Sequence, residues 1–515
     1  MLFWPTLVLL FLFLNSSLEA RSNAHTKHRR KVIATRHGDV AIDDGRCSRI
    51  GMVVLHEGGH AIDVTVAAAL CLGVVSLASN GIGVGAFLLM RLATSEQQAL
   101  DMRETAPFLA SENMYAGNAT LKSKGALSIA VPGELAGLHK AWKQHGKLQW
   151  ARLIRLAESL AHLGFKVSLY LQMQMERTES GILADEGLHS VFTSNGKLLQ
   201  KEDIYCNKKL AETLRRISDF GLEIFYNGTV GLDLVRDIKK AGGILMMKDL
   251  QTYQVKLKNP LSADIMGLKL LSMPPPSRGP PMILMLNILA QYGLPSGVSG
   301  SLGVHREIEA LKHAYAVRMN LGDPDFVNIS PKFAKELKKT INDNMTFDPE
   351  HYGGRWNQIH DYGTSHLSII LSPSTRIVLN NEMDDFSIPM SVTAGVLPPA
   401  PVNFIVWKDN QLKAVVGASC GGNIFAAIGE VLLNYFAIGK SPFSSVMTPR
   451  IYHQLIPNVV NYENWTTLYG NHFEVSASIR EALRKKGHVL TGLAGGTIIQ
   501  FIVQETDSLK GNKHL

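Results

Sequence analysis

The feature that most constrains this chain is a glycine–threonine pair deep inside it, in Asp361-Tyr-Gly-Thr364-Ser-His366-Leu-Ser368. The hydroxyl of Thr364 could attack the Gly363 carbonyl, and cleavage of that bond would free the amino group of Thr364. This amine can then serve as the base for its own hydroxyl, which is the N-terminal threonine form of nucleophilic catalysis. The pattern therefore suits a precursor that cuts itself. On these residues alone, a strand rich in Ser and Thr stays an open alternative.

An acidic block follows shortly downstream, in Asn380-Asn-Glu382-Met-Asp384-Asp385-Phe. The carboxylates of Glu382 and Asp385 could receive the ammonium group of a substrate. The other interpretation of this block is an ordinary acidic turn after a strand.

Several further motifs are spread over the chain after its first twenty residues. They are Ala41-Ile-Asp-Asp-Gly-Arg-Cys, Arg103-Glu-Thr-Ala-Pro, Val131-Pro-Gly-Glu, Met273-Pro-Pro-Pro-Ser, Met319-Asn-Leu-Gly-Asp-Pro, Val415-Val-Gly-Ala-Ser and Ala494-Gly-Gly-Thr. With these motifs and the two segments above, the chain resembles the gamma-glutamyltransferases (glutathione hydrolases). Two segments, Ile451-Tyr-His-Gln-Leu-Ile-Pro-Asn and Tyr462-Glu-Asn-Trp-Thr-Thr, are most similar to the plant-type branch of that family.

The resemblance implies a function and a division of the chain. The protein would cleave itself at Gly363-Thr364 into a heavy region, 21–363, and a light region, 364–515, which stay together as a heterodimer. It would then cleave the γ-glutamyl amide of glutathione and its conjugates through a γ-glutamyl ester of Thr364. The γ-glutamyl group would pass to water or to an amino acid or dipeptide acceptor.

The same resemblance assigns roles to single residues. Arg103 matches the arginine that binds the substrate α-carboxylate, for which a fork-shaped cation is suited. Glu382 and Asp385 match the carboxylates that bind the α-ammonium group. Backbone N–H groups of a glycine-rich turn would hold the oxyanion. The remaining matches are Cys420 and Gly421 in that turn, and Gly363, His366 and Ser368 as supporting residues.

Two alternatives bear on this site. An isolated arginine such as Arg103 commonly ends in an ion pair, here with Glu104 or Asp101. No metal or organic cofactor is expected, because threonine, its own amine and backbone donors can supply the chemistry.

The chain also departs from the family pattern. About twenty residues are absent after Ile370, enough for a hairpin return, and a second gap falls between Ile405 and Val406. Cys420 stands where the family has the first of two adjacent glycines, and Val84 replaces another glycine. A second hypothesis is therefore a catalytically degenerate family member that remains uncleaved.

The first residues predict a secretory leader. An apolar run, Met1 to Leu14, is followed by small polar residues up to Ala20, which predicts a signal peptide over 1–20. The run has no preceding Lys or Arg, so an uncleaved anchor stays open. Five Asn-x-Ser/Thr sequons that follow the leader agree with the secretory pathway. They begin at Asn118, Asn227, Asn328, Asn344 and Asn464. We therefore expect a protein of the cell wall, the extracellular space or the plasma membrane.

Composition narrows the remaining classes. A chain of 515 residues can bury a large core in one domain or in two tightly packed ones. The net charge of +8 partly reflects the run Arg21 to Arg36, and nothing suggests nucleic-acid binding. Four cysteines are too few and too scattered for a disulfide scaffold or a metal cluster, and the sequence does not pair them. They are Cys47, Cys71, Cys206 and Cys420.

Two short motifs point to other chemistry. His56-Glu-Gly-Gly-His60 fits the zinc-protease pattern, but two glycines weaken the helix that must carry both histidines. Gly417-Ala-Ser419-Cys-Gly421 fits a nucleophile elbow, with Glu430 and His453 as conceivable partners. An elbow requires a parallel α/β sheet before it, and the preceding residues do not alternate in that way.

Hydrophobic periodicity predicts helices first and short strands later, an α+β fold. The resemblance identifies it as the N-terminal nucleophile hydrolase fold, a four-layer αββα sandwich. Helices are expected over 64–72, 133–145, 149–163, 208–220, 232–241, 282–292, 302–321, 423–436 and 477–486. Strands are expected over 365–370, 376–381, 402–407 and 412–416.

Overall fold

The computed structural model describes residues 33–35, 38–77, 80–118, 120–319, 328–354, 370–385, 403–419, 421–467, 470 and 472–505. The chain divides into two units, Met1–Asp39 and Val40–Leu515. Every helix and strand given below belongs to the second unit. The signal peptide predicted over 1–20 lies outside the described residues.

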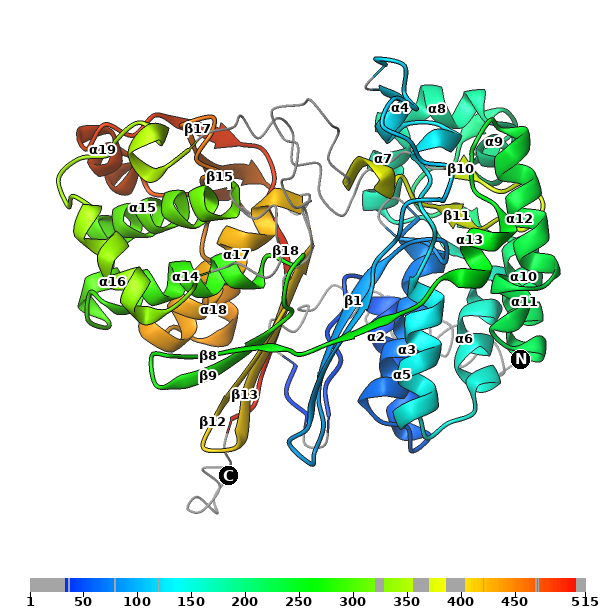
Figure 1. Ribbon diagram of the computed structural model, residues 1–515, viewed down its shortest axis with the longest axis horizontal. Coiled ribbons are helices and arrows are strands. Elements are labelled where there is room, and N and C mark those ends of the chain that lie inside the picture. Colours follow the sequence, from blue (N-terminus) through cyan, green and yellow to red (C-terminus); the bar gives the residue numbers. More distant parts are fainter. Residues whose placement is uncertain are drawn as a thin grey trace, which may run out of the picture. The chain divides into compact units, whose positions relative to one another are not determined.

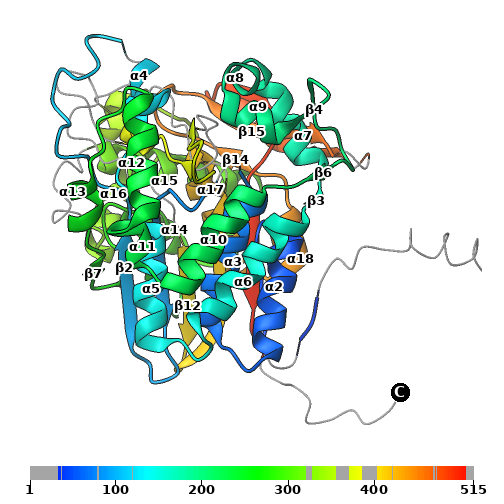
Figure 2. The same ribbon diagram turned by 90° about the vertical axis from the view of Figure 1, so that its right-hand side faces the viewer.

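A layer of helices comes from the first half of the chain. Helix α2 (Gly45–His56) begins where the Asp44 carboxylate accepts a hydrogen bond from the Arg46 N–H at 2.8 Å. It is followed by α3 (Ala61–Val75), α5 (Glu134–His145), α6 (Trp150–Leu163) and α10 (Lys208–Phe220). Figure 2 shows α2, α3, α6 and α10 side by side. Helix α3 is apolar on all sides because neighbouring helices bury it on all sides.

A disulfide ties two of these helices together. Cys47 of α2 is bonded to Cys71 of α3, with 5.5 Å between their Cα atoms. This finding settles the pairing that the sequence left open. Cys206 is a free thiol, and Cys420 lies outside the described residues.

The first large sheet has the order β1-β2-β7 and is antiparallel throughout. Its strands are β1 (Ala86–Arg91), β2 (Gln97–Met102) and β7 (Lys256–Lys258). On one face, Met90 and Leu100 pack against Ala141 of α5. On the other face, Phe87 and Ala99 pack against Met273, which follows the second sheet.

The second large sheet has the order β18-β13-β12-β9-β8 and is also antiparallel. Its strands are β8 (Leu261–Ile265), β9 (Leu268–Ser272), β12 (Asn403–Lys408), β13 (Gln411–Ser419) and β18 (Ile498–Val503). Its inner face turns Leu271, Ile405 and Trp407 toward Leu89 of β1. Its outer face packs on the buried helices α14 (Gly279–Ala290) and α17 (Ile424–Leu432). The result is helices, sheet, sheet, helices, the four layers that were predicted (Figure 1).

A third sheet packs against α15 (Gly300–Met319) and α19 (Ala477–Lys485). In it β15 (Val460–Thr466) pairs with β14 (Ile451–Tyr452), β16 (His472–Glu474) and, in parallel, β17 (Leu490–Leu493). The small strand pairs are β3 (Phe165–Lys166) with β6 (Ile204–Tyr205), β4 (Thr193–Ser194) with β5 (Lys197–Leu198), and β10 (Ile370–Leu371) with β11 (Val378–Leu379).

The remaining helices are shorter. They are α4 (Thr120–Ser123), α7 (Leu169–Arg177), α8 (Glu179–Ala184), α9 (Glu186–Phe192), α11 (Glu223–Tyr226), α12 (Thr229–Lys240), α13 (Met247–Thr252), α16 (Pro331–Thr340) and α18 (Pro442–Met447). The 3-10 turns are Ala126–Ser128, Ser296–Val298, Pro349–Tyr352, Glu382–Asp385 and Gly421–Asn423, and one π-helical turn spans Leu433–Ala437.

The predicted helices all occur, with bounds that differ by a few residues. The helix predicted over 423–436 ends at Leu432 and continues as the π-helical turn. The expectation that strands come late was wrong, because β1, β2, β7, β8 and β9 precede residue 363. The strand predicted over 376–381 is only Val378–Leu379, and of the one predicted over 365–370 only Ile370 is described. Among the described residues, no helix is long and apolar enough to cross a membrane.

Candidate functional site

The structure brings Arg103 and Glu382 together. Arg103 follows β2, and its Nη2 donates to Oε1 of Glu104 at 2.8 Å. Its Nη1 lies 3.5 Å from Oε1 of Glu382, and the two side chains are 11% and 15% exposed. The ion pair with Glu104 that was weighed as an alternative is thus present. It lies in a nearly buried site that also contains the predicted partner Glu382.

Asn380 places Glu382. The amide oxygen of Asn380 accepts hydrogen bonds from the N–H of Ala130 at 2.8 Å and of Glu382 at 3.1 Å. Its amide nitrogen donates to the carbonyls of Gly83 at 2.7 Å and Ala130 at 3.1 Å. Asn380 is buried, so these bonds are shielded from water. The sequence analysis gave this asparagine no role, although it stands two residues before Glu382.

Gly85 completes the contact with Glu382. Its N–H donates to Oε2 of Glu382 at 2.9 Å. A Cβ atom at Gly85 would lie 2.4 Å from Oε2 of Glu104, so only glycine fits this close approach. The preceding residue, Val84, replaces a family glycine, yet its carbonyl accepts the N–H groups of Gly133 and Glu134 at the start of α5. A backbone contact of this kind tolerates a valine side chain.

The charges at this site suit a zwitterion. Burial holds the pKa of the Glu104 carboxyl well above its usual range, although Arg103 opposes that shift, and the neighbouring Glu382 raises the pKa further. Burial thus disfavours the charged form of Glu104 at this site. The Arg103 guanidinium and the Glu382 carboxylate lie side by side. An α-carboxylate can bind to the first and an α-ammonium group to the second.

The other predicted site residues are placed in part or not at all. Asp385 ends the 3-10 turn Glu382–Asp385, and its side chain is outside what the structure describes. Thr364 and the supporting Gly363, His366 and Ser368 lie outside the described residues, as does Cys420. Their roles stay predictions.

Gly421 lies in a turn between β13 and α17. Its φ of +62° is in the left-handed region that favours glycine, and Gly422 follows it. Nη1 of Arg278 donates to the Gly421 carbonyl at 3.5 Å, and the Tyr315 hydroxyl donates to the Gly422 carbonyl at 3.1 Å. The chain therefore has an adjacent glycine pair in this turn, and the left-handed position is occupied by a glycine.

The zinc-protease pattern is not built. His56 is the last residue of α2, Gly58 takes a φ of +88°, and His60 caps the start of α3. The two histidines are therefore on different helices, whereas the motif needs them on one helical face. Glu57 instead forms an ion pair with Arg152.

The nucleophile-elbow pattern is not built either. Ser419 ends β13, whose neighbours β12 and β18 are both antiparallel to it. Glu430 accepts the N–H of Ile451 at 2.7 Å, and Nδ1 of His453 accepts the N–H of Leu455 at 2.9 Å. These bonds tie Glu430 of α17 to β14 and His453 to the loop that follows β14, and the antiparallel strands around Ser419 are not the parallel sheet that an elbow needs.

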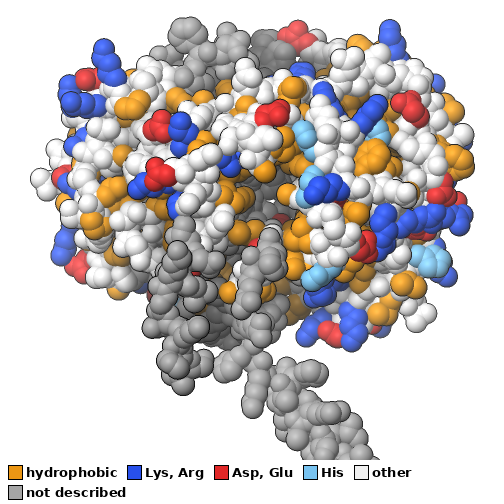
Figure 3. Space-filling view, turned by 90° about the horizontal axis from the view of Figure 1, so that it is seen from below, with side chains coloured by type: hydrophobic (Ala, Val, Ile, Leu, Met, Phe, Trp, Pro, Cys, Tyr) orange, Lys and Arg blue, Asp and Glu red, His pale blue; other side chains and the backbone are white. Residues whose placement is uncertain are grey.

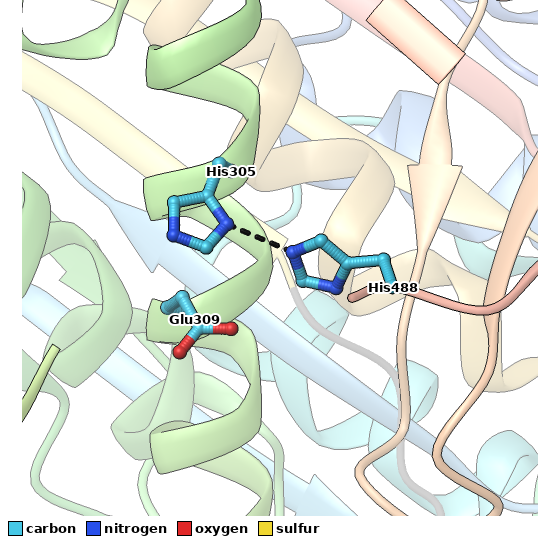
Figure 4. A group of neighbouring side chains, drawn as sticks. All are labelled: His305, Glu309 and His488. Carbon is cyan, nitrogen blue, oxygen red and sulfur yellow. Dashed lines mark hydrogen bonds between the residues drawn. The ribbon is translucent and has the colours of Figure 1, made fainter. Parts of the chain in front are cut away.

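One buried group has metal-binding residue types. Ligand atoms of His305, Glu309 and His488 lie within 4.8 Å of one another. Figure 4 shows a nitrogen of each imidazole ring pointing toward the other ring, with Glu309 one turn along α15. Nδ1 of His305 is 2.8 Å from Nε2 of His488, and Thr346 and Tyr352 both donate to the Glu309 carboxylate. Because these atoms already bond to each other, the group is a satisfied polar network, and we assign no metal to it.

The described surface carries charges of both signs (Figure 3). On the face drawn in Figure 3, Lys and Arg side chains lie among acidic and hydrophobic ones. The described residues of this face thus form no continuous basic stripe of the kind that follows a phosphate backbone.

Comparison with known proteins identifies relatives over the whole described unit. The family model for gamma-glutamyltranspeptidase matches residues 47–372 and 368–514. Its two segments meet at the place where the sequence analysis found residues missing. Glutathione hydrolase 2 of Arabidopsis thaliana is 56% identical, over 95% of this chain and 93% of its own length. That alignment spans 536 positions, more than the 515 residues of this chain, so it includes positions where this chain has no residue.

Further matches agree. Glutathione hydrolase 3 of Arabidopsis thaliana is 46% identical over 92% of this chain and 82% of its own length. The crystal structure of Helicobacter pylori gamma-glutamyltranspeptidase is 33% identical, with a TM-score of 0.59 over 62% of this chain and 96% of that one. Cephalosporin acylase from Bacillus halodurans shares the fold, with a TM-score of 0.77 over 94% of this chain at 21% identity. The prediction of an N-terminal nucleophile hydrolase fold is confirmed.

Proposed function

The chain belongs to the gamma-glutamyltranspeptidase family, and on that premise we propose that it hydrolyses glutathione and related γ-glutamyl amides. The observation that carries the proposal is the adjacency of Arg103 and Glu382, 3.5 Å apart in a nearly buried site. This pair matches the α-carboxylate and α-ammonium groups that every free γ-glutamyl donor carries. Asp385, in the same turn as Glu382, would add a second carboxylate for the ammonium group.

The chemistry would use Thr364. After self-cleavage, its amine would take the proton of its hydroxyl while the oxygen attacks the γ-carbonyl carbon. The C–N bond would break, the leaving amine would take the proton, and a γ-glutamyl ester would remain. Water, or the amine of an amino acid or dipeptide acceptor, would then attack that ester, so that the bond to the Thr364 oxygen breaks and the proton of the attacking group passes through the Thr364 amine to that oxygen. The backbone N–H groups of the turn at Gly421 would stabilise the oxyanion in both steps.

Processing and location complete the proposal. We propose a proenzyme that is cut into heavy and light fragments, 21–363 and 364–515, after a leader over 1–20 directs it to the secretory pathway. Four of the five sequon asparagines are exposed, which supports glycosylation in that pathway. They are Asn118, Asn227, Asn328 and Asn344. The protein would act in the cell wall, the extracellular space or at the plasma membrane.

The alternative of a degenerate, uncleaved member is not favoured. Glutathione hydrolase 2, a relative that is named for an activity, matches 95% of this chain at 56% identity. A relative from Arabidopsis thaliana whose name marks it as inactive matches only 28% of this chain. The gap after Ile370 does not remove Arg103, Glu382 or the residues that hold these two side chains in place.

Two measurements on the secreted chain test the proposal. The first is a denaturing gel with N-terminal sequencing of any smaller fragment, which we expect to begin at Thr364. The second is release of p-nitroaniline from L-γ-glutamyl-p-nitroanilide, with a Thr364→Ala variant as the matched control. An intact chain with a folded circular-dichroism spectrum and no such activity would refute the proposed function.

A further inference from the structure

Lys258 joins the two facing sheets beside Arg103. It is the last residue of β7, in the sheet β1-β2-β7. Its Nζ lies 2.9 Å from Oδ2 of Asp101 on β2 of the same sheet. The same Nζ donates at 2.7 Å to the carbonyl of Pro275, in the turn that leads from β9 of the other sheet to α14. One ammonium group therefore contacts both β2 of the first sheet and the turn that follows β9 of the second.

On the first sheet, this contact leads to the backbone of Arg103. The second oxygen of Asp101, Oδ1, accepts the N–H of Arg103 at 3.2 Å. The Tyr253 hydroxyl donates to the Arg103 carbonyl at 2.8 Å. The peptide groups on both sides of Arg103 are thus fixed, and Lys258 holds the carboxylate that fixes one of them. A guanidinium on a fixed backbone keeps its orientation toward a substrate carboxylate.

On the second sheet, the contact leads to the turn of Gly421. Within the Pro275 turn, the Ser277 N–H donates to the Pro274 carbonyl at 3.1 Å. Arg278 follows directly and donates to the Gly421 carbonyl at 3.5 Å. Lys258 is therefore linked through Asp101 to Arg103, which would bind the substrate carboxylate. It is linked through the Pro275 turn and Arg278 to the turn at Gly421, which would bind the oxyanion.

An ordinary surface ion pair is the simpler interpretation of Lys258 and Asp101. Exposed pairs contribute little to stability and hold little in place. Here the Lys258 side chain is 27% exposed and that of Asp101 only 9%. The lysine also forms a short bond to the carbonyl of Pro275, in the turn after β9 of the opposite sheet, which a pair on one surface does not have. These two facts favour a structural link over a solvated pair.

We infer that Lys258 is a positioning residue for γ-glutamyl transfer. It keeps the guanidinium of Arg103 and the glycine turn at Gly421 at a fixed separation, so that a bound donor presents its γ-carbonyl to the nucleophile. The inference rests on the proposed function, because it assigns Arg103 to the α-carboxylate of the donor.

Three variants of the full-length, self-processed protein test the inference. Lys258→Met removes the ammonium group and keeps the aliphatic stem, whereas Lys258→Arg keeps a cation at the same place. Lys256→Met is the matched control, because Lys256 is an exposed lysine of the same strand. Hydrolysis of L-γ-glutamyl-p-nitroanilide gives kcat and KM for each variant, and the melting temperature reports on the fold.

We expect Lys258→Met to lower kcat/KM by about ten-fold, mostly through a higher KM, because Arg103 loses its fixed position. The apparent inhibition constant of L-glutamate should rise by a similar factor, since its α-carboxylate uses the same guanidinium. Lys258→Arg should recover most of the loss, and Lys256→Met should equal the wild type.

Each other outcome has a defined meaning. Wild-type kinetics in processed Lys258→Met, or an equal loss in Lys256→Met, would overturn the inference while leaving the proposed function intact. A processed wild type without hydrolysis would overturn the function itself. If Lys258→Met does not fold, Asp101→Asn takes its place, because it removes the same ion pair and keeps an acceptor for the Arg103 N–H. Loss of folding in both variants would show a purely structural pair and overturn the inference.

Discussion

Nζ of Lys312 lies 3.6 Å from Oε1 of Glu309, and neither side chain has any exposed surface. Both residues belong to α15, one turn apart. The Thr346 hydroxyl accepts a hydrogen bond from the lysine and donates one to Oε1 of the glutamate. The Tyr352 hydroxyl donates to the other carboxylate oxygen of Glu309. The pair is therefore enclosed in a hydrogen-bonded network that anchors residues 346–352 on α15.

Removing one charge of this pair should be costly. Lys312→Met leaves the Glu309 carboxylate buried without its cation, and breaking a buried pair in this way costs about 3–5 kcal/mol. Denaturant unfolding at neutral pH measures the loss. Lys335→Met is the control, because Lys335 is an exposed lysine of α16 and its loss should change stability by less than about 0.5 kcal/mol. Equal stabilities of the two variants would contradict the prediction.

Gly85→Ala should damage catalysis more than folding. Its new Cβ would meet Oε2 and N of Glu104 at 2.4 and 2.6 Å, and it would push apart the group formed by Arg103, Glu104 and Glu382. A displacement of about 1 Å at such a site costs about a hundred-fold in kcat/KM. Gly181→Ala is the matched control, since a Cβ there meets nothing within 4 Å. Steady-state kinetics on both variants, at equal extents of self-cleavage, make the comparison.

The bridge between Cys47 and Cys71 should stabilise the helical layer. Replacing both cysteines with serine should lower the free energy of unfolding by about 2–4 kcal/mol, chiefly because the unfolded chain loses a closed loop. Urea unfolding with and without reductant checks this. Reductant should destabilise the wild type and leave the double variant unchanged. A Cys206→Ser variant, which changes a free thiol, should behave as the wild type does.

The sequence predicted the elements whose pattern is local. Helix α10 was found with its predicted bounds because an apolar stripe and Gly221 define it within one segment. Strands β1 and β2 were missed because the sheet is covered on both faces, which removes the alternation of polar and apolar residues. Asp101, a charged residue inside β2, has its cation on Lys258 of the neighbouring strand β7, which is remote in the sequence.

The same distinction applies to the site. Arg103 and Glu382 were assigned from motifs, and their side chains lie together in the structure, whereas their roles stay predictions. Asn380, Gly85 and Tyr253 act through backbone contacts with partners that are remote in the sequence. Such contacts depend on how the layers pack, so no spacing within one segment could have predicted them. The cysteine pairing depends on the adjacency of α2 and α3 in the same way.

Glu134 gives the last prediction, a pH-dependent one. Its side chain is buried among apolar residues that include Leu70, Ile82 and Leu135. Burial raises the pKa of its carboxyl to about 8 from an ordinary value of 4.5. Since the folded pKa lies above the unfolded one, the contribution of Glu134 to stability is fully present below about pH 4.5. It is lost progressively as the pH rises toward 8.

Glu134→Gln should remove that dependence. The quantity to compare is the free energy of unfolding of the variant minus that of the wild type. This difference should be larger at about pH 8.5 than at about pH 5, by roughly a few kcal/mol. Glu179→Gln, at an exposed position of α8, is the control and should show no such increase. Urea unfolding of the three proteins at both pH values measures it. A constant difference between Glu134→Gln and the wild type would contradict the prediction, because it would mean that the Glu134 carboxyl titrates alike in the folded and unfolded protein.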